Sequence, residues 1–125
     1  MDIGIKGKAC EIVKEGNTAL SMGSGGLKVY ATPAMIALAE KAAYLSVEEY
    51  LEEGQGTVGT LMDIKHMAAT PVGMEVRAES ELIEVNNREL TFKIEVFDER
   101  EKIGEGIHKR FIIYNEKFQN KVNAK

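Results

Sequence analysis

The sequence predicts an α+β fold in which a five-stranded antiparallel sheet wraps around one long central helix. Only one segment, residues 30–51, is long and apolar enough to form a buried helix. Most of the segments around it alternate between apolar and polar residues, as strands do when one face of a sheet is buried. The 125 residues suit a single domain over residues 1–125 with a sizeable hydrophobic core.

The first strand is predicted over residues 8–14, where apolar residues stand among charges. Cys10 lies in this strand and is the only cysteine, so it cannot form an internal disulfide; we expect it to be a small buried hydrophobe. Residues 17–28 then form a glycine-bearing loop that is long for a compact domain. Loops of this length tend to act as lids or binding segments.

The central helix is predicted to begin with Thr32 as its N-cap and Pro33 at the first helical position. Residues 34–39 are apolar on every face, which is typical of a helix enclosed by protein. Glu40 follows them, and its carboxylate must be paired, hydrogen-bonded or neutral because burying an isolated charge is costly. A subunit interface, a nearby basic side chain and a catalytic role would each account for it. Gly54 predicts the end of the helical region.

Alternation continues after the helix. Residues 74–85 and 90–96 both alternate, and the two asparagines between them favour a turn, which predicts a β-hairpin. In residues 57–69, Asp63 and Lys65 fall on the outward face of a predicted strand. The inward face of that strand then carries Val58, Thr60, Met62, Ile64, His66 and Ala68.

Residues 103–114 are predicted as the last strand, with Gly104 and Gly106 where the backbone bends or approaches a neighbour closely. We expect the four strands after the helix to form an antiparallel meander, followed by a polar tail with a short helix. A sheet curled around one helix covers only one side of that helix. The all-round apolar start of the helix therefore predicts a homodimer, with assembly into tetramers left open.

Composition excludes several classes of function. Charged residues make up 29% of the chain, the net charge is -4, and the two signs are interleaved, which disfavours binding to nucleic acid or to a membrane. No export signal is recognisable at the start and no apolar run reaches the ~18 residues of a membrane span, so we expect a cytoplasmic protein. His66 and His108 lack the spacing of metal ligands, so no metal site is expected.

Thr32, Glu40 and His66 are the polar residues that the predicted fold sends inward. A hydroxyl, a carboxylate and an imidazole near a helix start are the groups that acyl transfer needs. The free N–H groups of the helix start could also stabilise a developing oxyanion. Each residue also has a structural interpretation, since Thr32 can be only an N-cap and His66 only a hydrogen-bonded core histidine.

The chain resembles the fluoroacetyl-CoA thioesterase family, whose members have the hotdog fold. The resemblance is carried by A-T-P before Glu40, by G-Q-G-T-V-G-T at residues 54–60 and by H-M-A-A-T-P-V-G at residues 66–73. It is also carried by I-G-E-G-I-H-K-R at residues 103–110 and by E-K-F-Q-N-K-V at residues 116–122. The match covers nearly everything after Lys8. Before the helix the family has a lid rich in aromatics, whereas this chain has the shorter, glycine-rich N-T-A-L-S-M-G-S-G-G-L-K-V-Y.

The resemblance implies an acyl-CoA thioesterase that hydrolyses a small acyl-CoA, with coenzyme A as part of the substrate and no cofactor. It implies that Thr32, Glu40 and His66 are catalytic and that the backbone of Gly59 helps to bind the acyl carbonyl. Glu40 would either attack the carbonyl or act as general base toward water. A non-catalytic acyl-CoA-binding or sensing protein is the alternative, and a hotdog dehydratase matches the motifs less well. By their positions, three basic residues are candidates to bind the coenzyme A phosphates: Lys65, Lys109 and Arg110. The alternative interpretation is that they are only solvated surface charges.

Overall fold

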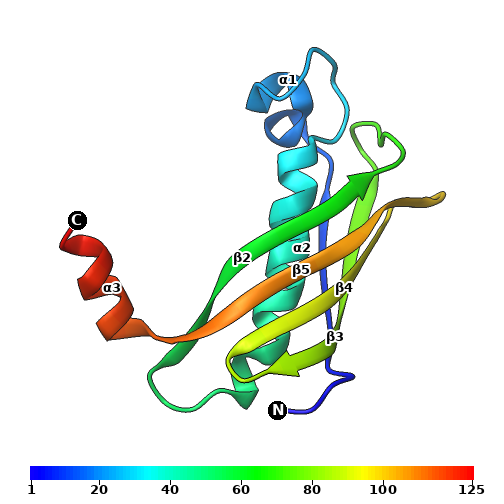
Figure 1. The fold of residues 1–125 in the computed structure, drawn as a ribbon. Coiled ribbons are helices and arrows are strands. Elements are labelled where there is room, and N and C mark those ends of the chain that lie inside the picture. The colour runs from blue at the N-terminus through cyan, green and yellow to red at the C-terminus, as the bar shows by residue number, and fades with distance from the viewer.

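The computed structural model describes all residues 1–125 as five strands and three α-helices (Figure 1). Short 3-10 turns at Glu15–Asn17 and Glu48–Tyr50 complete the secondary structure. In chain order the elements are β1 (Lys6–Ile12), α1 (Ala19–Met22), α2 (Thr32–Val47), β2 (Gln55–His66), β3 (Glu75–Asn86), β4 (Glu89–Phe97), β5 (Lys102–Tyr114) and α3 (Asn115–Asn123).

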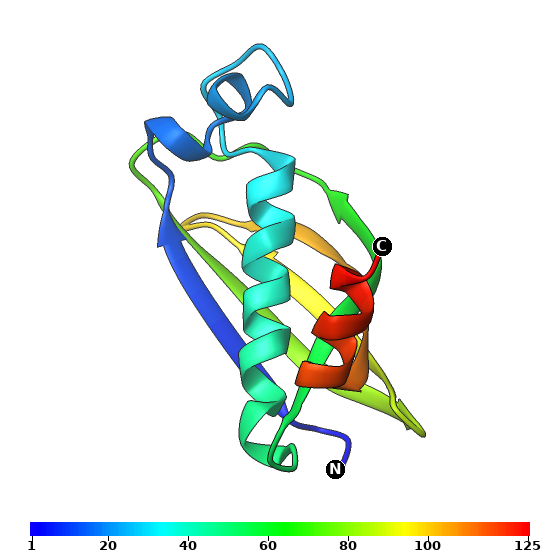
Figure 2. The ribbon, with the colours of Figure 1, turned by 90° about the vertical axis from the view of Figure 1, so that its left-hand side faces the viewer.

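The five strands form one antiparallel sheet in the order β1-β3-β4-β5-β2. The sheet curls across one side of α2, which lies along its inner face (Figures 1 and 2). This confirms the predicted α+β fold with a sheet wrapped around one helix. The predicted four-strand meander is wrong, because β2 pairs with β5 and leaves only β3, β4 and β5 as a meander. Residues 67–74 are too long for a tight hairpin and carry the chain from one edge of the sheet to the far side of β4.

The core lies between α2 and the inner face of the sheet. The predicted hairpin is confirmed, and Leu90, Phe92, Ile94 and Val96 of β4 are completely buried. Alternation along β3 places Val76, Ala78, Ser80 and Leu82 on the same inner side. The facing side of α2 is built largely from small residues, which lets the sheet approach the helix closely; its buried residues are Ala34, Met35, Leu38, Ala39, Ala42, Ala43 and Val47.

The start of α2 differs from the prediction. Ala31, not Thr32, is the N-cap, and no side chain caps the helix. Thr32 is the first helical residue, and its hydroxyl contacts His66 instead of a backbone N–H of the helix. Helix α2 then ends at Val47 and passes into the 3-10 turn, so the predicted helical region breaks before Gly54. The hydroxyl of Thr32 is therefore free for a role outside helix capping.

Strand β2 contains a β-bulge that reverses part of its predicted face assignment. The register with β5 shifts between Gly59 and Leu61, so Thr60 is an extra residue. After the bulge, Met62 and Ile64 pack on the core as predicted. Before the bulge the prediction is wrong, because the inward positions are those of Thr57 and Gly59 rather than Val58 and Thr60, and Thr60 is exposed.

Two predictions about the N-terminal region also need correction. Cys10 lies in β1 but is exposed, because alternation along the edge strand turns Ala9 inward and Cys10 outward. The predicted loop over residues 17–28 is partly helical, since α1 forms within it with Thr18 as N-cap. Tyr30 then anchors the chain before α2, because its buried hydroxyl donates a hydrogen bond to Glu11 on β1.

At the C-terminus, α3 confirms the predicted short helix and projects from the end of β5 (Figure 1). In β5, a β-carbon at Gly106 would overlap the carbonyl of Asp63, and one at Gly104 would lie 2.8 Å from the sulfur of Met35. Both glycines therefore mark the close approaches that the sequence predicted. No helix of the structure has the length and apolar character needed to cross a membrane.

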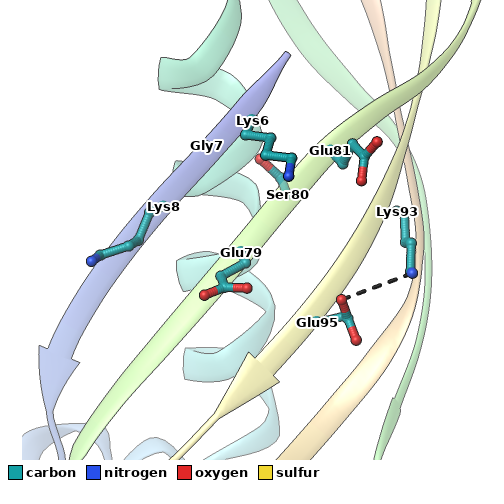
Figure 3. Close-up of a pocket in the computed structure, with 8 residues that line it drawn as sticks. All are labelled: Lys6, Gly7, Lys8, Glu79, Ser80, Glu81, Lys93 and Glu95. Atoms are coloured by element: carbon teal, nitrogen blue, oxygen red, sulfur yellow. Dashed lines mark ion pairs between the residues drawn. The ribbon is translucent and has the colours of Figure 1, made fainter. Parts of the chain in front are cut away.

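The outer face of the sheet is charged. Figure 3 shows a hollow over β1, β3 and β4 whose side chains carry charges of both signs, with Lys93 and Glu95 3.9 Å apart. Lys6 and Lys8 on β1 stand opposite acidic residues on β3. No apolar residue lines this hollow, so it lacks the apolar walls typical of small-molecule sites. The candidate catalytic residues lie elsewhere, along α2 and β2.

Candidate active site

Thr32 and His66 form one half of the candidate site. Thr32 opens α2 and His66 ends β2, so the sheet edge meets the start of the helix at this point. The hydroxyl oxygen of Thr32 lies 2.7 Å from Nδ1 of His66, which is a hydrogen bond. This contact confirms that His66 lies on the inward side of β2, as the alternation predicted, and it places the ring at the start of α2.

The second ring nitrogen of His66 is unpaired. Its Nε2 is shielded from solvent and has no hydrogen-bond partner in the chain, which is unusual for a buried polar atom. Burial lowers the pKa of the His66 imidazole, and the nearby Ala68 backbone only partly opposes this shift. The ring is therefore neutral at pH 7, with one nitrogen fixed by Thr32 and the other available.

Glu40 and Arg110 form the other half. The carboxylate oxygen Oε2 of Glu40 lies 3.6 Å from Nη1 of Arg110, and the two side chains are 42% and 7% exposed. Glu40 thus has the basic partner that its apolar surroundings required. Burial lowers the pKa of the Arg110 guanidinium while the Glu40 carboxylate opposes the shift, and an arginine keeps its charge in this situation.

The guanidinium of Arg110 is fixed on several sides. Its Nε donates to the hydroxyl of Thr57 at 2.8 Å, and its Nη2 donates to the Thr57 carbonyl at 2.9 Å. Its Nη1 lies 3.2 Å from Nε2 of His108, and its Cζ lies over the ring of Tyr44, 5.6 Å from the ring centroid. The sequence did not predict a site role for Thr57 or His108. The signal for His108 was its spacing of two from Arg110, which places both residues on one face of β5.

Gly59 lies where these side chains converge. A β-carbon on Gly59 would lie 2.8 Å from Oε2 of Glu40, 3.4 Å from Cε1 of His108 and 3.5 Å from Nη1 of Arg110. The missing side chain therefore leaves the room that the Glu40 carboxylate occupies. The same bulge exposes the backbone of Gly59 at the surface.

Within one chain, the three predicted catalytic residues do not meet. Thr32 and Glu40 are eight residues apart on α2, which corresponds to about 12 Å along the helix axis. His66 lies in contact with Thr32, whereas Gly59 and Arg110 lie next to Glu40. The structure thus brings the predicted residues together as two groups.

The two predicted lysines lie outside both groups. Lys65 is exposed on β2 next to His66, and Lys109 points to the opposite face of β5 from Arg110 and lies 3.6 Å from a carboxylate oxygen of Glu89. Beside Glu40 and Arg110 the surface is hollowed over an open volume of about 490 Å³. This hollow is lined by Ala37, Glu40, Lys41, Tyr44, Leu45 and Arg110.

Comparison with known proteins identifies the family. Residues 13–116 match the family described as fluoroacetyl-CoA-specific thioesterase. A curated fluoroacetyl-CoA thioesterase of Streptantibioticus cattleyicolor is 40% identical over 98 residues, covering 78% of this chain and 70% of the relative. The chain belongs to the fluoroacetyl-CoA-specific thioesterase family. This confirms the resemblance seen in the motifs and makes the protein a thioester hydrolase.

Solved structures agree with this assignment to the thioesterase family. The fluoroacetyl-CoA thioesterase FlK is similar with a TM-score of 0.93 at 33% identity, covering 100% of this chain and 97% of that one. A variant of FlK in complex with fluoroacetate and CoA gives a TM-score of 0.88 at 32% identity, covering 94% and 99%. A thioesterase superfamily member of Thermus thermophilus has a TM-score of 0.91 at 23% identity, covering 98% and 91%, which shows the shared hotdog fold.

Proposed function

We propose that the protein hydrolyses the thioester bond of a small acyl-CoA. The observation that carries the proposal is the Glu40 carboxylate, which Arg110 holds at 3.6 Å beside the side-chain-free position of Gly59 and an open hollow. A carboxylate held in this way can reach a carbonyl carbon or a water molecule. The FlK variant solved with fluoroacetate and CoA supports a substrate of this class.

The complete site is proposed to form in a homodimer. If two α2 helices crossed antiparallel about a two-fold axis near residue 36, residue 32 of each copy would face residue 40 of the other. Pro33 and Ala37 are exposed on α2 and small enough to allow close approach of the helices. Each site would then combine Thr32 and His66 of one copy with Glu40, Gly59 and Arg110 of the other.

The chemistry follows from these groups. The acyl carbonyl oxygen would accept a hydrogen bond from the Gly59 N–H, a kind of contact worth about 3 to 4 kcal/mol of barrier. Glu40 would attack the carbonyl carbon to form a mixed anhydride, or would take a proton from an attacking water. The C–S bond breaks in either route, and the Nε2–H of the neutral His66 ring would donate a hydrogen bond to the departing thiolate sulfur. In the anhydride route, water would then hydrolyse the anhydride and regenerate the Glu40 carboxylate. In the general-base route, the proton that Glu40 takes from water would pass to the thiolate or to solvent. Thr32 would orient the His66 ring by donating to Nδ1.

Coenzyme A binding is proposed to use exposed positive charge near His66. Arg110 is 6% exposed and committed to Glu40 and Thr57, so it is better placed to act at the acyl group than at the phosphates. Lys65 is exposed next to His66 and is the remaining candidate near the pair. Contacts between exposed charges are screened by salt, so the KM for acyl-CoA should rise with ionic strength.

The acyl group is proposed to be a small aliphatic one. The segment above the start of α2 contains α1 and has no aromatic residue between Asn17 and Lys28. It presents Leu20, Met22 and Leu27 as exposed aliphatic side chains. Such a lid supplies apolar contact without aromatic rings, so acetyl- and propionyl-CoA should be hydrolysed without a strong preference for fluoroacetyl-CoA.

The test is thiol release from a panel of acetyl-, propionyl- and fluoroacetyl-CoA, measured with Ellman reagent. The wild type should turn over the panel, and Glu40→Gln should lower kcat by orders of magnitude while the protein stays folded. Binding of acyl-CoA without thiol release by the wild type would instead support a non-catalytic binding protein. Turnover by Glu40→Gln at the wild-type rate would refute the role of Glu40.

A further inference from the structure

His108 is a buried titratable residue to which the proposed mechanism gives no task. It lies on β5, is completely buried and stacks on Phe92 with ring centroids 6.0 Å apart. Both of its ring nitrogens have partners, Leu61 on one side and Arg110 on the other. It therefore stands between the backbone of β2 and the guanidinium that pairs with Glu40.

The partners of His108 fix the position of its proton. Nδ1 lies 2.9 Å from the carbonyl oxygen of Leu61, which can only accept, so Nδ1 must carry the hydrogen. Nε2 lies 3.2 Å from Nη1 of Arg110, which can only donate, so Nε2 must be the acceptor. His108 is thus a neutral imidazole in the Nδ1–H form. Burial lowers its pKa, with the Leu61 carbonyl opposing the shift and the Arg110 charge adding to it, which agrees with this form.

The contact with Leu61 ties His108 to the bulge of β2. The register shift lies between Gly59 and Leu61, so the carbonyl that accepts from His108 belongs to the residue directly after Thr60, the extra residue of the bulge. The Cε1 atom of His108 would also lie 3.4 Å from a β-carbon on Gly59. The imidazole therefore supports the stretch of backbone that presents Gly59.

The contact with Arg110 sets the direction of the guanidinium. Thr57 accepts hydrogen bonds from Nε and Nη2 of Arg110, so only Nη1 remains to contact His108 and Glu40. With one Nη1 hydrogen directed to Nε2 of His108, the other is directed toward the Glu40 carboxylate. Without an acceptor at this point, Nη1 would lose one of the contacts that hold it toward Glu40.

We propose that His108 is a positioning residue, which holds Arg110 against Glu40 and steadies the bulge that carries Gly59. The proposal rests on the proposed thioester hydrolysis, because it assigns His108 a role at the same site. His108 touches neither the carbonyl nor the attacking group in this scheme. It acts through Arg110 and Leu61.

Two isosteric variants separate the two contacts of His108. In His108→Gln, the side-chain oxygen can take the place of Nε2 and accept from Arg110. In His108→Asn, the side-chain N–H can take the place of Nδ1 and donate to Leu61, but no acceptor reaches Arg110. We expect His108→Asn to lower kcat about 100-fold with KM little changed, because a misplaced catalytic group costs roughly this much. We expect His108→Gln to retain kcat within about tenfold.

A measurement independent of activity checks the contact directly. The ¹⁵N resonances of the ring in the wild type should show a protonated Nδ1 and an unprotonated Nε2. The Nη1 resonance of Arg110 should keep its wild-type position in His108→Gln and should shift in His108→Asn, where Nη1 loses its acceptor while Thr57 still holds Nε and Nη2. A proton on Nε2 of the wild type would overturn the proposal without reference to turnover.

The outcomes distinguish this proposal from the proposed function. Wild-type turnover in His108→Asn, or equal losses in both variants accompanied by equal losses of thermal stability, would overturn the positioning role. A wild type that releases no thiol would refute the proposed function and any catalytic effect of His108, while the ring resonances would still decide the contact with Arg110.

Discussion

Replacement of Gly59 by alanine perturbs the position of the Glu40 carboxylate while retaining the backbone N–H of residue 59. The added β-carbon would lie 2.8 Å from Oε2 of Glu40, whereas ordinary contacts begin at 3.4 Å. The carboxylate must therefore move by about 0.6 Å, which is feasible because it is the end of a flexible, 42% exposed side chain. The fold should tolerate the change.

A displacement of this size should lower the turnover of acetyl-CoA by roughly 10- to 100-fold, which is about 1.4 to 2.7 kcal/mol of barrier. The assay is steady-state thiol release together with a thermal melt. Gly16→Ala is the matched control, because a β-carbon there meets nothing within 4 Å. If Gly59→Ala kept the wild-type kcat, or lost activity only by unfolding, the placement of Glu40 beside Gly59 would not matter for catalysis.

Three further predictions concern the other groups. Thr32→Val should lower kcat because it removes the hydroxyl that lies 2.7 Å from His66 Nδ1, whereas Thr32→Ser keeps the hydroxyl and should keep kcat. Equal rates in the two variants would argue against an orienting role of this hydroxyl. The free energy of unfolding should fall as pH is lowered below about 6.5. The reason is that folding lowers the pKa values of His66 and His108, so the unfolded chain binds protons at these residues before the folded chain does. Denaturant melts at pH 7.5 and 5.5 test this, and His108→Gln should reduce the difference in unfolding free energy between the two pH values. Lys65→Ala should raise the KM for acetyl-CoA and weaken its salt dependence, and an unchanged salt dependence would exclude Lys65 from phosphate binding.

The sequence predicted those features that depend on local patterns. The apolar run before Glu40 predicted the central helix, and strict alternation predicted the buried face of β4. The apolar surroundings of Glu40 correctly predicted that it would need a partner. The family motifs pointed to Thr32 and His66, which the structure joins by a hydrogen bond.

Features that depend on long-range pairing were not predictable from one sequence. The edge position of β2 next to β5 has no local signal, because strand order depends on which edges are left free. The bulge near Gly59 adds a single residue, Thr60, and one residue is enough to exchange the two faces of a strand. Counting by twos from His66 back through the strand therefore gave the wrong face before the bulge.

The cluster around Arg110 was missed for a related reason. Arg110 looked like an ordinary strand cation, yet it is buried and paired with Glu40. Its spacing from His108 was visible, but a shared strand face becomes a site only when a helix residue such as Glu40 packs against it. Side chains from α2, β2 and β5 build this cluster, and no single segment contains enough of it to be recognised.

The proposed active site combines Thr32 and His66 of one copy with Glu40 of another. Mixing the inactive variants Glu40→Gln and His66→Ala and allowing subunits to exchange tests it most directly. In a mixed dimer one site would combine an intact His66 with an intact Glu40, so the acetyl-CoA hydrolase rate should recover to about a quarter of the wild-type value. If the site lay within one chain, every site would keep a defect, and the mixture would stay as inactive as its parents.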